Sequence, residues 1–348
     1  MKDIFLESHN IKNPYTGLGQ FNLNLLLGLN KSATGTSLRF HYYSMNNSFK
    51  DNLDPKRFLD NKYYSFSKFP LLRNKKKYDV WHSLNQNTKI EPYHSIPYVL
   101  TIHDINFYKK LDKSRLNNFK KKIERATAIT YISNFVKQDA HQVFSIPQVP
   151  EYVIHNGNSI CRSHTNIPAY QTDKPYLFSI GDFLERKNFH ILIAMLQYLP
   201  DFQLIIAGNH DRKYGQTVLQ EITKNNLEKR VILTGKISNH QKIALYKGCS
   251  AFVTAGENEG FCLPVIEAMN FGKPTFLYRN AALPEIGDRF AYYWDQLEPE
   301  YMASILLEGL SHNPNNISEE EIKNHAKKFN WEKSALDYLY VYQETLNS

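Results

Sequence analysis

Residues 256–288 read GENEGFCLPVIEAMNFGKPTFLYRNAALPEIGD. Pro264 is expected to open a short apolar helix, because its missing N–H would have no intrahelical partner in the first turn. Gly272 then ends the helix as a C-terminal glycine, and Pro274 prevents the helix from resuming. The stretch therefore predicts a tight loop that leads into a helix N-terminus, where free backbone N–H groups favour an anion such as phosphate.

Two carboxylates enclose this loop, with seven residues between them. Glu267 is expected in the first turn of the helix, where it can accept hydrogen bonds from two neighbouring hydroxyls, as on a ribose. Glu259, just before the turn, would reach the other end of the same ligand. An ordinary buried helix after a loop would leave both glutamates unexplained, so the pattern favours a nucleotide-sugar site.

The segment resembles the donor-site signature of glycosyltransferase family 4, whose members are retaining enzymes. The matched positions are Glu259-Gly260-Phe261, Leu263-Pro264, Glu267-Ala268-Met269, Gly272, Pro274 and Leu283-Pro284-Glu285. Cys262 departs from the family's usual glycine, which bears on how closely the backbone there approaches the donor sugar.

The resemblance implies a GT-B fold, two Rossmann-like α/β domains facing a central cleft. It also implies that Glu259 acts at the reaction centre and that Glu267 binds the ribose of the donor. The loop between them would line the donor through Gly260, Phe261, Cys262 and Leu263.

A second element, GDFLERKN, spans residues 181–188. The sequence contains no Asp-x-Asp pair, the usual carboxylate site for a diphosphate-bound cation, so positive charge must come from side chains and helix N-termini. Arg186 and Lys187 supply it between an expected strand, Tyr176–Gly181, and an expected helix, Asn188–Leu199. An Arg-Lys pair alone would more often be a solvent-facing turn, but the stretch resembles a family element, which implies that both residues bind the diphosphate.

Thr101-Ile102-His103-Asp104 follows an apolar strand. It resembles a Thr-Val-His-Asp element of the family, which implies that His103 lies near the donor sugar and the reacting centre. A neutral imidazole could hydrogen-bond a sugar hydroxyl or the phosphate, whereas a charged one could help the leaving group. A structural histidine is the alternative, and the role of Asp104 stays open.

Two further loops are candidates for donor binding. Gly17 and Gly19 lie in a strand-to-helix turn that allows close backbone approach to a phosphate or sugar. The turn resembles a family loop, with Gln20 in place of the common arginine, and a plain tight turn is the alternative. Ile237 ends a segment, Leu233–Ile237, that typically lies by the nucleotide base in the family.

Apolar runs alternate with helical patterns along the whole chain, which indicates parallel α/β units. The expected strands of the first half are Ile4–Glu7, Leu38–Tyr43, Asp79–His82, Tyr98–His103, Ala128–Ser133 and Tyr152–His155. Those of the second half are Tyr176–Gly181, Gln203–Gly208, Val231–Gly235, Ser250–Thr254, Thr275–Leu277 and Phe290–Tyr293. The polar stretch between the halves predicts an acceptor-side domain over residues 1–165 and a donor-binding domain over 166–330, and the resemblance implies that the helix 331–348 packs back on the first domain.

Composition narrows the class of protein. The 348 residues suit two domains. Residues 1–165 carry 24 Lys and Arg against 12 Asp and Glu, whereas residues 166–348 carry 18 against 22. The three cysteines lack the spacing of metal ligands and cannot all form disulfides, which favours the reducing cytoplasm as the compartment of the protein. The polar start of the chain is no signal peptide, and no apolar run is long enough for a membrane span.

The basic excess concentrates in Arg73–Lys77 and Lys109–Arg125. It predicts weak, salt-sensitive association with an anionic membrane through one basic helix and the first cluster. A solvated basic face is the alternative. Nucleic-acid binding is a third option, but none of its recognised motifs accompanies the charge.

These features together predict a metal-independent retaining glycosyltransferase without a cofactor, acting in the cytoplasm. It would move a hexose from a nucleoside diphosphate sugar, in the first instance GDP-mannose, to a glycan or lipid-linked acceptor in surface polysaccharide (lipopolysaccharide) synthesis. A same-fold UDP-sugar 2-epimerase and a non-catalytic nucleotide-sugar or glycan-binding protein are the alternatives.

Overall fold

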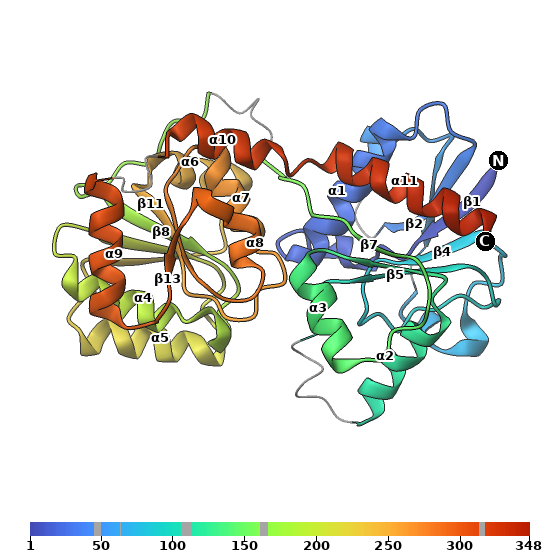
Figure 1. Cartoon of the computed structure of the whole chain (residues 1–348), viewed down its shortest axis with the longest axis horizontal. Helices are drawn as coiled ribbons and strands as arrows, with labels where there is room; N and C mark the ends of the chain where they lie inside the picture. Colours follow the sequence, from blue (N-terminus) through green and yellow to red (C-terminus); the bar gives the residue numbers. More distant parts are fainter. Residues whose placement is uncertain (45–49, 63, 106–112, 161–165, 313–316) are drawn as a thin grey trace. The chain divides into compact units, whose positions relative to one another are not determined.

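A computed structural model describes residues 1–44, 50–62, 64–105, 113–160, 166–312 and 317–348. The chain forms two compact units (Figure 1). Unit 1 comprises Met1–Ser159 together with Phe329–Ser348, and unit 2 comprises Ile160–Lys328. Cys161 and the start of the predicted basic helix, residues 109–112, lie outside the described residues.

Unit 1 is built on a seven-stranded parallel sheet in the order β3-β2-β1-β4-β5-β6-β7. Its strands are β1 (Lys2–Leu6), β2 (Leu38–Ser44), β3 (Phe58–Lys62), β4 (Val80–Ser83), β5 (Tyr98–Ile102), β6 (Ala128–Tyr131) and β7 (Glu151–Val153). Helices α1 (Gly17–Ser32) and α11 (Trp331–Asn347) cover one face of this sheet, and α2 (Lys113–Arg125) and α3 (Asn134–Val143) cover the other (Figure 1). Short 3₁₀ helices are η1 (His9–Lys12), η2 (Lys50–Asn52), η3 (Ser65–Lys68) and η4 (Pro70–Leu72).

The predicted strands of unit 1 are confirmed to within two residues at their ends, since parallel strands buried on both faces read as apolar runs. The prediction missed β3, whose sequence FLDNK has only two apolar residues. It lies at the edge of the sheet, where one neighbouring strand suffices and polar residues are tolerated.

Helix α11 is an integral part of unit 1, although it lies far from the rest of the unit in the sequence. A Cβ atom on Gly28 of α1 would lie 2.6 Å from the carbonyl oxygen of Trp331, so only glycine allows the two helices to approach this closely. The Tyr342 hydroxyl lies 2.7 Å from His82 Nδ1 on β4, and both side chains are fully buried.

Unit 2 is built on a six-stranded parallel sheet in the order β10-β9-β8-β11-β12-β13. Its strands are β8 (Tyr176–Ile180), β9 (Gln203–Ala207), β10 (Val231–Gly235), β11 (Ala251–Thr254), β12 (Thr275–Tyr278) and β13 (Tyr292–Trp294). Its α-helices are α4 (Phe189–Met195), α5 (Lys213–Lys224), α6 (Asn239–Gly248), α7 (Leu263–Asn270), α8 (Leu283–Gly287), α9 (Pro299–His312) and α10 (Glu319–Lys327). Short 3₁₀ helices are η6 (Glu185–Lys187), η7 (Leu196–Tyr198) and η8 (Asp288–Phe290).

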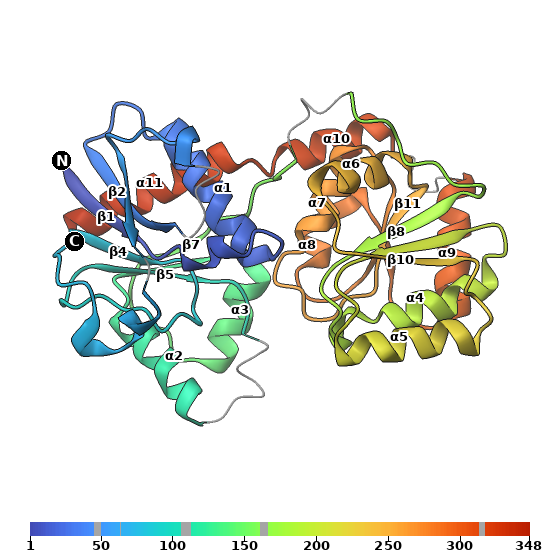
Figure 2. The ribbon, with the colours of Figure 1, turned by 180° about the vertical axis from the view of Figure 1, so that it is seen from behind.

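Helices α4, α5 and α9 lie together on one face of the unit 2 sheet, and α6, α7 and α10 lie on the other, as the view from behind in Figure 2 also shows. The predicted helix Asn188–Leu199 is shorter than expected. Asn188 is left-handed, with φ 51°, and α4 gives way to η7 after Met195. The prediction of two Rossmann-like α/β domains is confirmed.

The strand order reverses once in each sheet. In unit 2 the chain moves outward from β8 through β9 to β10, and then returns to place β11 on the other side of β8. Open α/β sheets bind ligands outside the carboxyl ends of their strands at such a switch point. The loops that follow β8 and β11 are therefore the expected binding loops of unit 2.

Candidate active site

Three charged side chains meet at the switch point of unit 2. Arg186 and Lys187 come from the loop after β8, and Glu259 comes from the loop after β11. Arg186 Nη1 lies 2.7 Å and Lys187 Nζ lies 2.8 Å from the same carboxylate oxygen, Glu259 Oε1. The Lys187 and Glu259 side chains are 10% and 7% exposed, whereas that of Arg186 is 40% exposed. Sequence analysis named all three residues, and the structure joins them in one cluster.

Two glycines provide the space for this cluster. A Cβ atom on Gly181 would lie 3.2 Å from Lys187 Cε, and a Cβ atom on Gly256 would lie 2.7 Å from Glu259 Oε1. The glycines at the ends of β8 and β11 therefore allow the lysine and the glutamate to fold back against the strand ends.

The two loops are also joined through Asn188 and the backbone. Asn188 Nδ2 donates to the Ala255 carbonyl at 3.1 Å and to Glu257 Oε1 at 3.2 Å. The Glu257 amide donates to the carbonyl of Arg186 at 2.7 Å. These bonds fix the position of the cations relative to Glu259 without any ligand.

The charges of the cluster do not cancel. Burial alone would raise the pKa of Glu259, but the neighbouring Lys187 ammonium and Arg186 guanidinium outweigh it and hold that pKa below its ordinary value. Glu259 is therefore ionised at neutral pH, and two cations against one carboxylate leave a net charge of about +1. An anion such as a phosphate group is the ligand that this balance favours.

Glu267 lies in α7, but one residue further from the start of the helix than predicted. The helix begins at Leu263, so Glu267 falls in its second turn, beyond the free N–H groups of the first. Its carboxylate is instead held by two residues of α6 that sequence analysis missed. Lys242 Nζ lies 2.6 Å from Glu267 Oε1, and the Tyr246 hydroxyl donates to Oε2 at 3.0 Å.

This arrangement prepares Glu267 to accept further hydrogen bonds. Each carboxylate oxygen can accept two hydrogen bonds, so each retains one acceptor position after its bond to Lys242 or Tyr246. The Lys242 and Glu267 side chains are 13% and 5% exposed, which shields their ion pair from solvent. No local pattern in the sequence points to the pair, because it depends on the packing of α6 beside α7.

The loop from Gly260 to Leu263 connects the two carboxylates. Phe261 and Cys262 are buried, and Gly260 and Leu263 are half-buried. Cys262 is the N-cap of α7 and adopts a left-handed conformation, with φ 68°. Glycine enters this region without a steric cost, which accounts for the family's preference at this position. Burial raises the pKa of the Cys262 thiol to about 12, so the thiol is neutral.

His103 lies in unit 1, directly after β5. Its Nε2 lies 2.9 Å from the Leu84 carbonyl, and because a carbonyl only accepts, Nε2 carries the proton and Nδ1 is left as an acceptor. Burial lowers the pKa of His103 to about 4, so the ring is neutral at pH 7. The possibility of a charged imidazole is thereby disfavoured, and the ring is suited to accept a hydrogen bond from a hydroxyl.

Gly17 and Gly19 at the start of α1 serve different purposes. A Cβ atom on Gly19 would lie 2.0 Å from the carbonyl oxygen of Asn13, so this glycine is required by packing within unit 1. A Cβ atom on Gly17 would meet nothing within 4 Å, so the space beside Gly17 is open. Thr16 caps the helix by accepting from the Gly19 amide at 3.2 Å.

Ile237 is half-buried in the loop between β10 and α6, two residues after the end of β10. It thus lies at the carboxyl edge of the unit 2 sheet, on the same loop that leads to Lys242. Within the described ranges, no group of three or more His, Cys, Asp or Glu side chains is placed to hold a metal ion.

Each unit also contains a surface pocket. One of about 320 Å³ opens in unit 1 near the carboxyl ends of β2 and β3. Its lining residues are Tyr43, Asn61, Lys62, Tyr64, Phe66, Ser67, Leu72 and Asn74.

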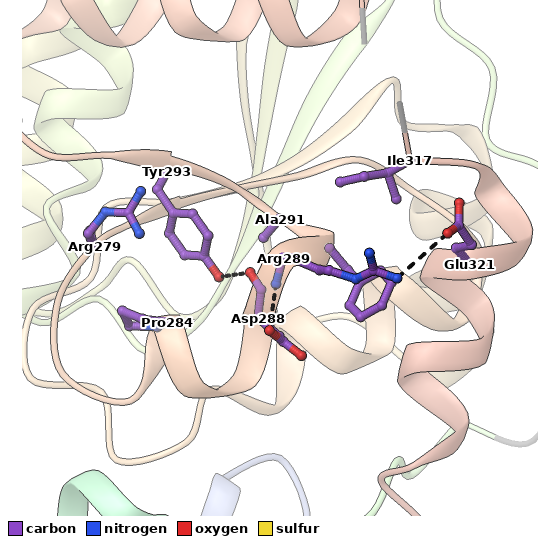
Figure 3. A pocket seen from close by; sticks show the side chains of 9 residues that line it. Arg279, Pro284, Asp288, Arg289, Ala291, Tyr293, Ile317 and Glu321 are labelled. Atoms are coloured by element: carbon purple, nitrogen blue, oxygen red, sulfur yellow. Dashed lines mark hydrogen bonds and ion pairs between the residues drawn. The ribbon is translucent and has the colours of Figure 1, made fainter. Parts of the chain in front are cut away.

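A second pocket, of about 610 Å³, lies in unit 2 and shares no residue with the charged cluster (Figure 3). Its arginines are already engaged, since Arg279 pairs with Asp295 at 2.6 Å and Arg289 lies 3.9 Å from Glu321. We therefore assign no ligand to it.

Comparisons with known proteins bear on the family and the fold. Residues 163–329, nearly all of unit 2, match the model of the family described as Glycosyl transferases group 1. The O-antigen chain mannosyltransferase B of Escherichia coli is 24% identical over 99% of this chain and 100% of its own length. The chain is a glycosyltransferase whose unit 2 belongs to group 1.

The fold of this glycosyltransferase is shared with solved structures. Sucrose-phosphate synthase from Thermosynechococcus elongatus superposes with a TM-score of 0.75 at 20% identity, over 99% of both chains. Anabaena HepE in complex with UDP and glucose superposes with a TM-score of 0.75 at 16% identity, over 99% of this chain and 100% of that one. The predicted GT-B fold class is thus confirmed. Of the helices that the structure describes, none has the length and hydropathy needed to cross a bilayer.

Proposed function

We propose that this glycosyltransferase transfers a hexose from a nucleoside diphosphate sugar to a saccharide acceptor, with retention of configuration and without a metal ion. The observation that carries the proposal is the cluster of Arg186, Lys187 and Glu259 at the switch point of unit 2. A departing diphosphate develops negative charge, and preorganised cations stabilise such charge more in the transition state than in the ground state.

Each site residue then has a role. Arg186 and Lys187 bind the diphosphate, and Glu267 accepts the two ribose hydroxyls with the support of Lys242 and Tyr246. Glu259 lies at the reaction centre.

We propose further donor contacts for loops of each unit taken by itself. Gly260, Phe261, Cys262 and Leu263 line the donor sugar, and Ile237 lies by the base. From unit 1, His103 accepts a hydrogen bond from a sugar hydroxyl through Nδ1. The open space beside Gly17 allows the backbone to approach the donor, whereas Gly19 only shapes the loop.

We propose a front-face course for the reaction. The bond from the anomeric carbon to the leaving phosphate oxygen breaks, and the acceptor oxygen bonds to the same face of the sugar. The proton of the acceptor hydroxyl passes to the leaving phosphate oxygen. In this scheme, the cations hold the phosphate in place while it takes up the proton.

GDP-mannose is the proposed donor, and a glycan or lipid-linked saccharide of surface polysaccharide synthesis is the proposed acceptor. Support comes from the mannosyltransferase name of the Escherichia coli relative. Anabaena HepE, solved with UDP and glucose, makes a UDP-sugar the second candidate. The pocket beside β2 and β3 is the proposed acceptor site of unit 1, because Tyr64 offers an aromatic ring on which a saccharide can pack. We place the activity in the cytoplasm, at the inner face of the membrane.

A panel of GDP-mannose, UDP-glucose and dTDP-rhamnose with saccharide acceptors tests the function. We expect an α-linked product from GDP-mannose, identified by mass spectrometry and by the coupling at its anomeric carbon, at an unchanged rate in excess EDTA. Loss of the product in EDTA with recovery on adding manganese or magnesium would refute metal independence. An inverted linkage would refute retention, and conversion of the donor without acceptor would favour an epimerase.

A further inference from the structure

One segment of unit 1 carries exposed apolar and basic side chains together. Residues 61–78 read NKYYSFSKFPLLRNKKKY and contain five lysines, one arginine and no acidic residue. The segment leads from β3 through η3 and η4 to β4. We call residues 64–77 the docking segment.

The docking segment exposes large apolar side chains close to one another. Leu71 is 85% exposed, Leu72 54% and Phe69 53%. Tyr64 and Phe66 are also exposed, and their rings stack with centroids 4.9 Å apart. A single exposed leucine is ordinary, but a group of this kind in one short segment is typical of a surface that binds a partner.

Lysines surround these apolar side chains. Lys68 Nζ lies 5.2 Å from the centroid of the Phe69 ring, and Lys75 Nζ lies 5.9 Å from that of the Tyr93 ring. Lys68, Lys75 and Lys77 are exposed, and in the part of the chain that the structure describes none of them forms an ion pair. Their charge is therefore available to an external anionic surface.

Helix α2, the other basic stretch, is less available. Lys122 and Arg125 both pair with Glu91, at 3.0 and 2.9 Å. Phe119 and Ile123, its main apolar residues, are buried in unit 1. The described part of α2 thus has its apolar stripe turned into the protein, and the docking segment is the better candidate surface.

We propose that the docking segment binds an anionic lipid bilayer, with Phe69 and Leu71 inserted among the acyl-chain ends and Lys68, Lys75 and Lys77 against the lipid phosphates. Charge complementarity selects the bilayer, because basic and apolar side chains without any carboxylate match an anionic surface over an apolar interior. This binding goes beyond the proposed glycosyl transfer and does not depend on it.

Insertion predicts a behaviour that charge alone does not produce. Raised salt screens the attraction of lysines to lipid phosphates but leaves the burial of apolar side chains intact. Binding to anionic vesicles should therefore fall with salt without vanishing.

Co-sedimentation of the whole protein tests the proposal. Vesicles of phosphatidylcholine with 30 mol% phosphatidylglycerol are compared with pure phosphatidylcholine, at low and high salt, without donor or acceptor. We expect strong binding to the anionic vesicles, which weakens with salt, and only weak binding to the neutral vesicles, which does not change with salt. The F69S/L71S variant should bind about tenfold or more weakly, and the K68Q/K75Q/K77Q variant should lose about fivefold per charge.

Two variants serve as controls. L336S changes a leucine of α11 in the same unit that is 56% exposed, and it should bind like the wild type. K120Q/K121Q removes two exposed lysines of α2 and should have only a small effect. In an L71W variant, quenching of the added tryptophan by brominated lipid reports insertion directly.

Three results would overturn the proposal. The first is that the wild-type protein does not bind anionic vesicles. The second is that F69S/L71S binds them as tightly as the wild type. The third is that K120Q/K121Q loses binding whereas K68Q/K75Q/K77Q does not. Because no nucleotide sugar is present in the assay, each is independent of the outcome for glycosyl transfer.

Discussion

Lys187 Nζ and Glu259 Oε1 lie 2.8 Å apart at the switch point of the unit 2 sheet, with both side chains nearly buried. The same carboxylate oxygen also binds Arg186 at 2.7 Å. Glu259 therefore forms ion pairs with both of the cations that we propose bind the diphosphate. A bound diphosphate must share these cations with Glu259.

Replacing Glu259 by Gln should separate binding from turnover. The uncharged amide no longer competes for Lys187 and Arg186, so GDP should bind as tightly as to the wild type or more tightly. Turnover should fall by about a hundredfold if the carboxylate acts at the reaction centre. Calorimetry with GDP and steady-state kinetics measure the two effects, and E185Q, which removes an exposed carboxylate of η6, is the control. Weaker GDP binding would contradict the competition.

The two cations should differ in their effect on stability. R186A removes a charge-assisted bond to phosphate, worth about 1.5–3 kcal/mol, so kcat/KM should fall about ten- to a hundredfold with little change in Tm. K187A should lower kcat/KM similarly and also reduce the free energy of unfolding by about 3 kcal/mol, because it removes the nearly buried partner of Glu259. Kinetics and thermal melts distinguish the two, and an unchanged rate in both variants would remove them from the site.

Glu267 and Lys242 should strengthen nucleotide binding only when the ribose of the nucleotide has hydroxyls. E267A should weaken GDP binding about tenfold and K242M about threefold, since Lys242 holds Glu267 Oε1 at 2.6 Å. Neither substitution should weaken binding of 2′,3′-dideoxyguanosine diphosphate, measured by calorimetry. K224M, on the exposed surface of α5, is the control. Equal losses for GDP and the dideoxy analogue would contradict the ribose assignment.

Glycine at position 262 should stabilise the protein. Cys262 adopts φ 68°, a region in which a residue with a Cβ atom loses about 1 kcal/mol. C262G should raise Tm by relieving this strain, against a smaller loss from lost side-chain contacts. C249G, at a buried cysteine with φ −68°, should lower Tm because no strain is relieved there. Differential scanning calorimetry measures both changes.

Acid should destabilise unit 1 through two buried histidines. Burial lowers the pKa of His103 to about 4, and burial together with the charge of His103 lowers that of His82 to about 3. The unfolded chain, with histidine pKa values near 6.5, binds more protons than the folded chain below that pH, so stability falls as the pH drops from 6.5 toward 4.

At pH 5 the loss is on the order of 2 kcal/mol for each histidine relative to neutral pH. The measurement is Tm against pH in the wild type and in H103N, which should show a shallower decline. Equal slopes would mean that His103 is not protonated differently in the folded and unfolded chains.

Most strands were predictable from the sequence, as was the loop that carries Glu259, because glycine, proline and apolar runs act locally. The ion pair between Lys187 and Glu259 was not. It depends on β11 returning to the side of β8, a pairing between strands separated by two βα units. The contact of Lys242 with Glu267 is non-local for the same reason.

Two smaller errors in the predicted helix boundaries have local causes. Helix α7 begins at Leu263 and not at Pro264, so Glu267 lies one residue further along the helix than the sequence alone suggested. The left-handed conformation of Asn188 likewise delayed the start of α4. Single-residue backbone conformations of this kind leave little trace in composition or periodicity.

Helix α11 gives the two units different histories during synthesis. Unit 2 is formed from one continuous stretch of chain, whereas unit 1 needs Trp331–Asn347 to cover α1 and to bond His82. The ribosome must therefore complete unit 2 before unit 1 has all its parts. We expect a nascent unit 1 to expose apolar surface beside Gly28 until then, and to depend on chaperones more than unit 2 does.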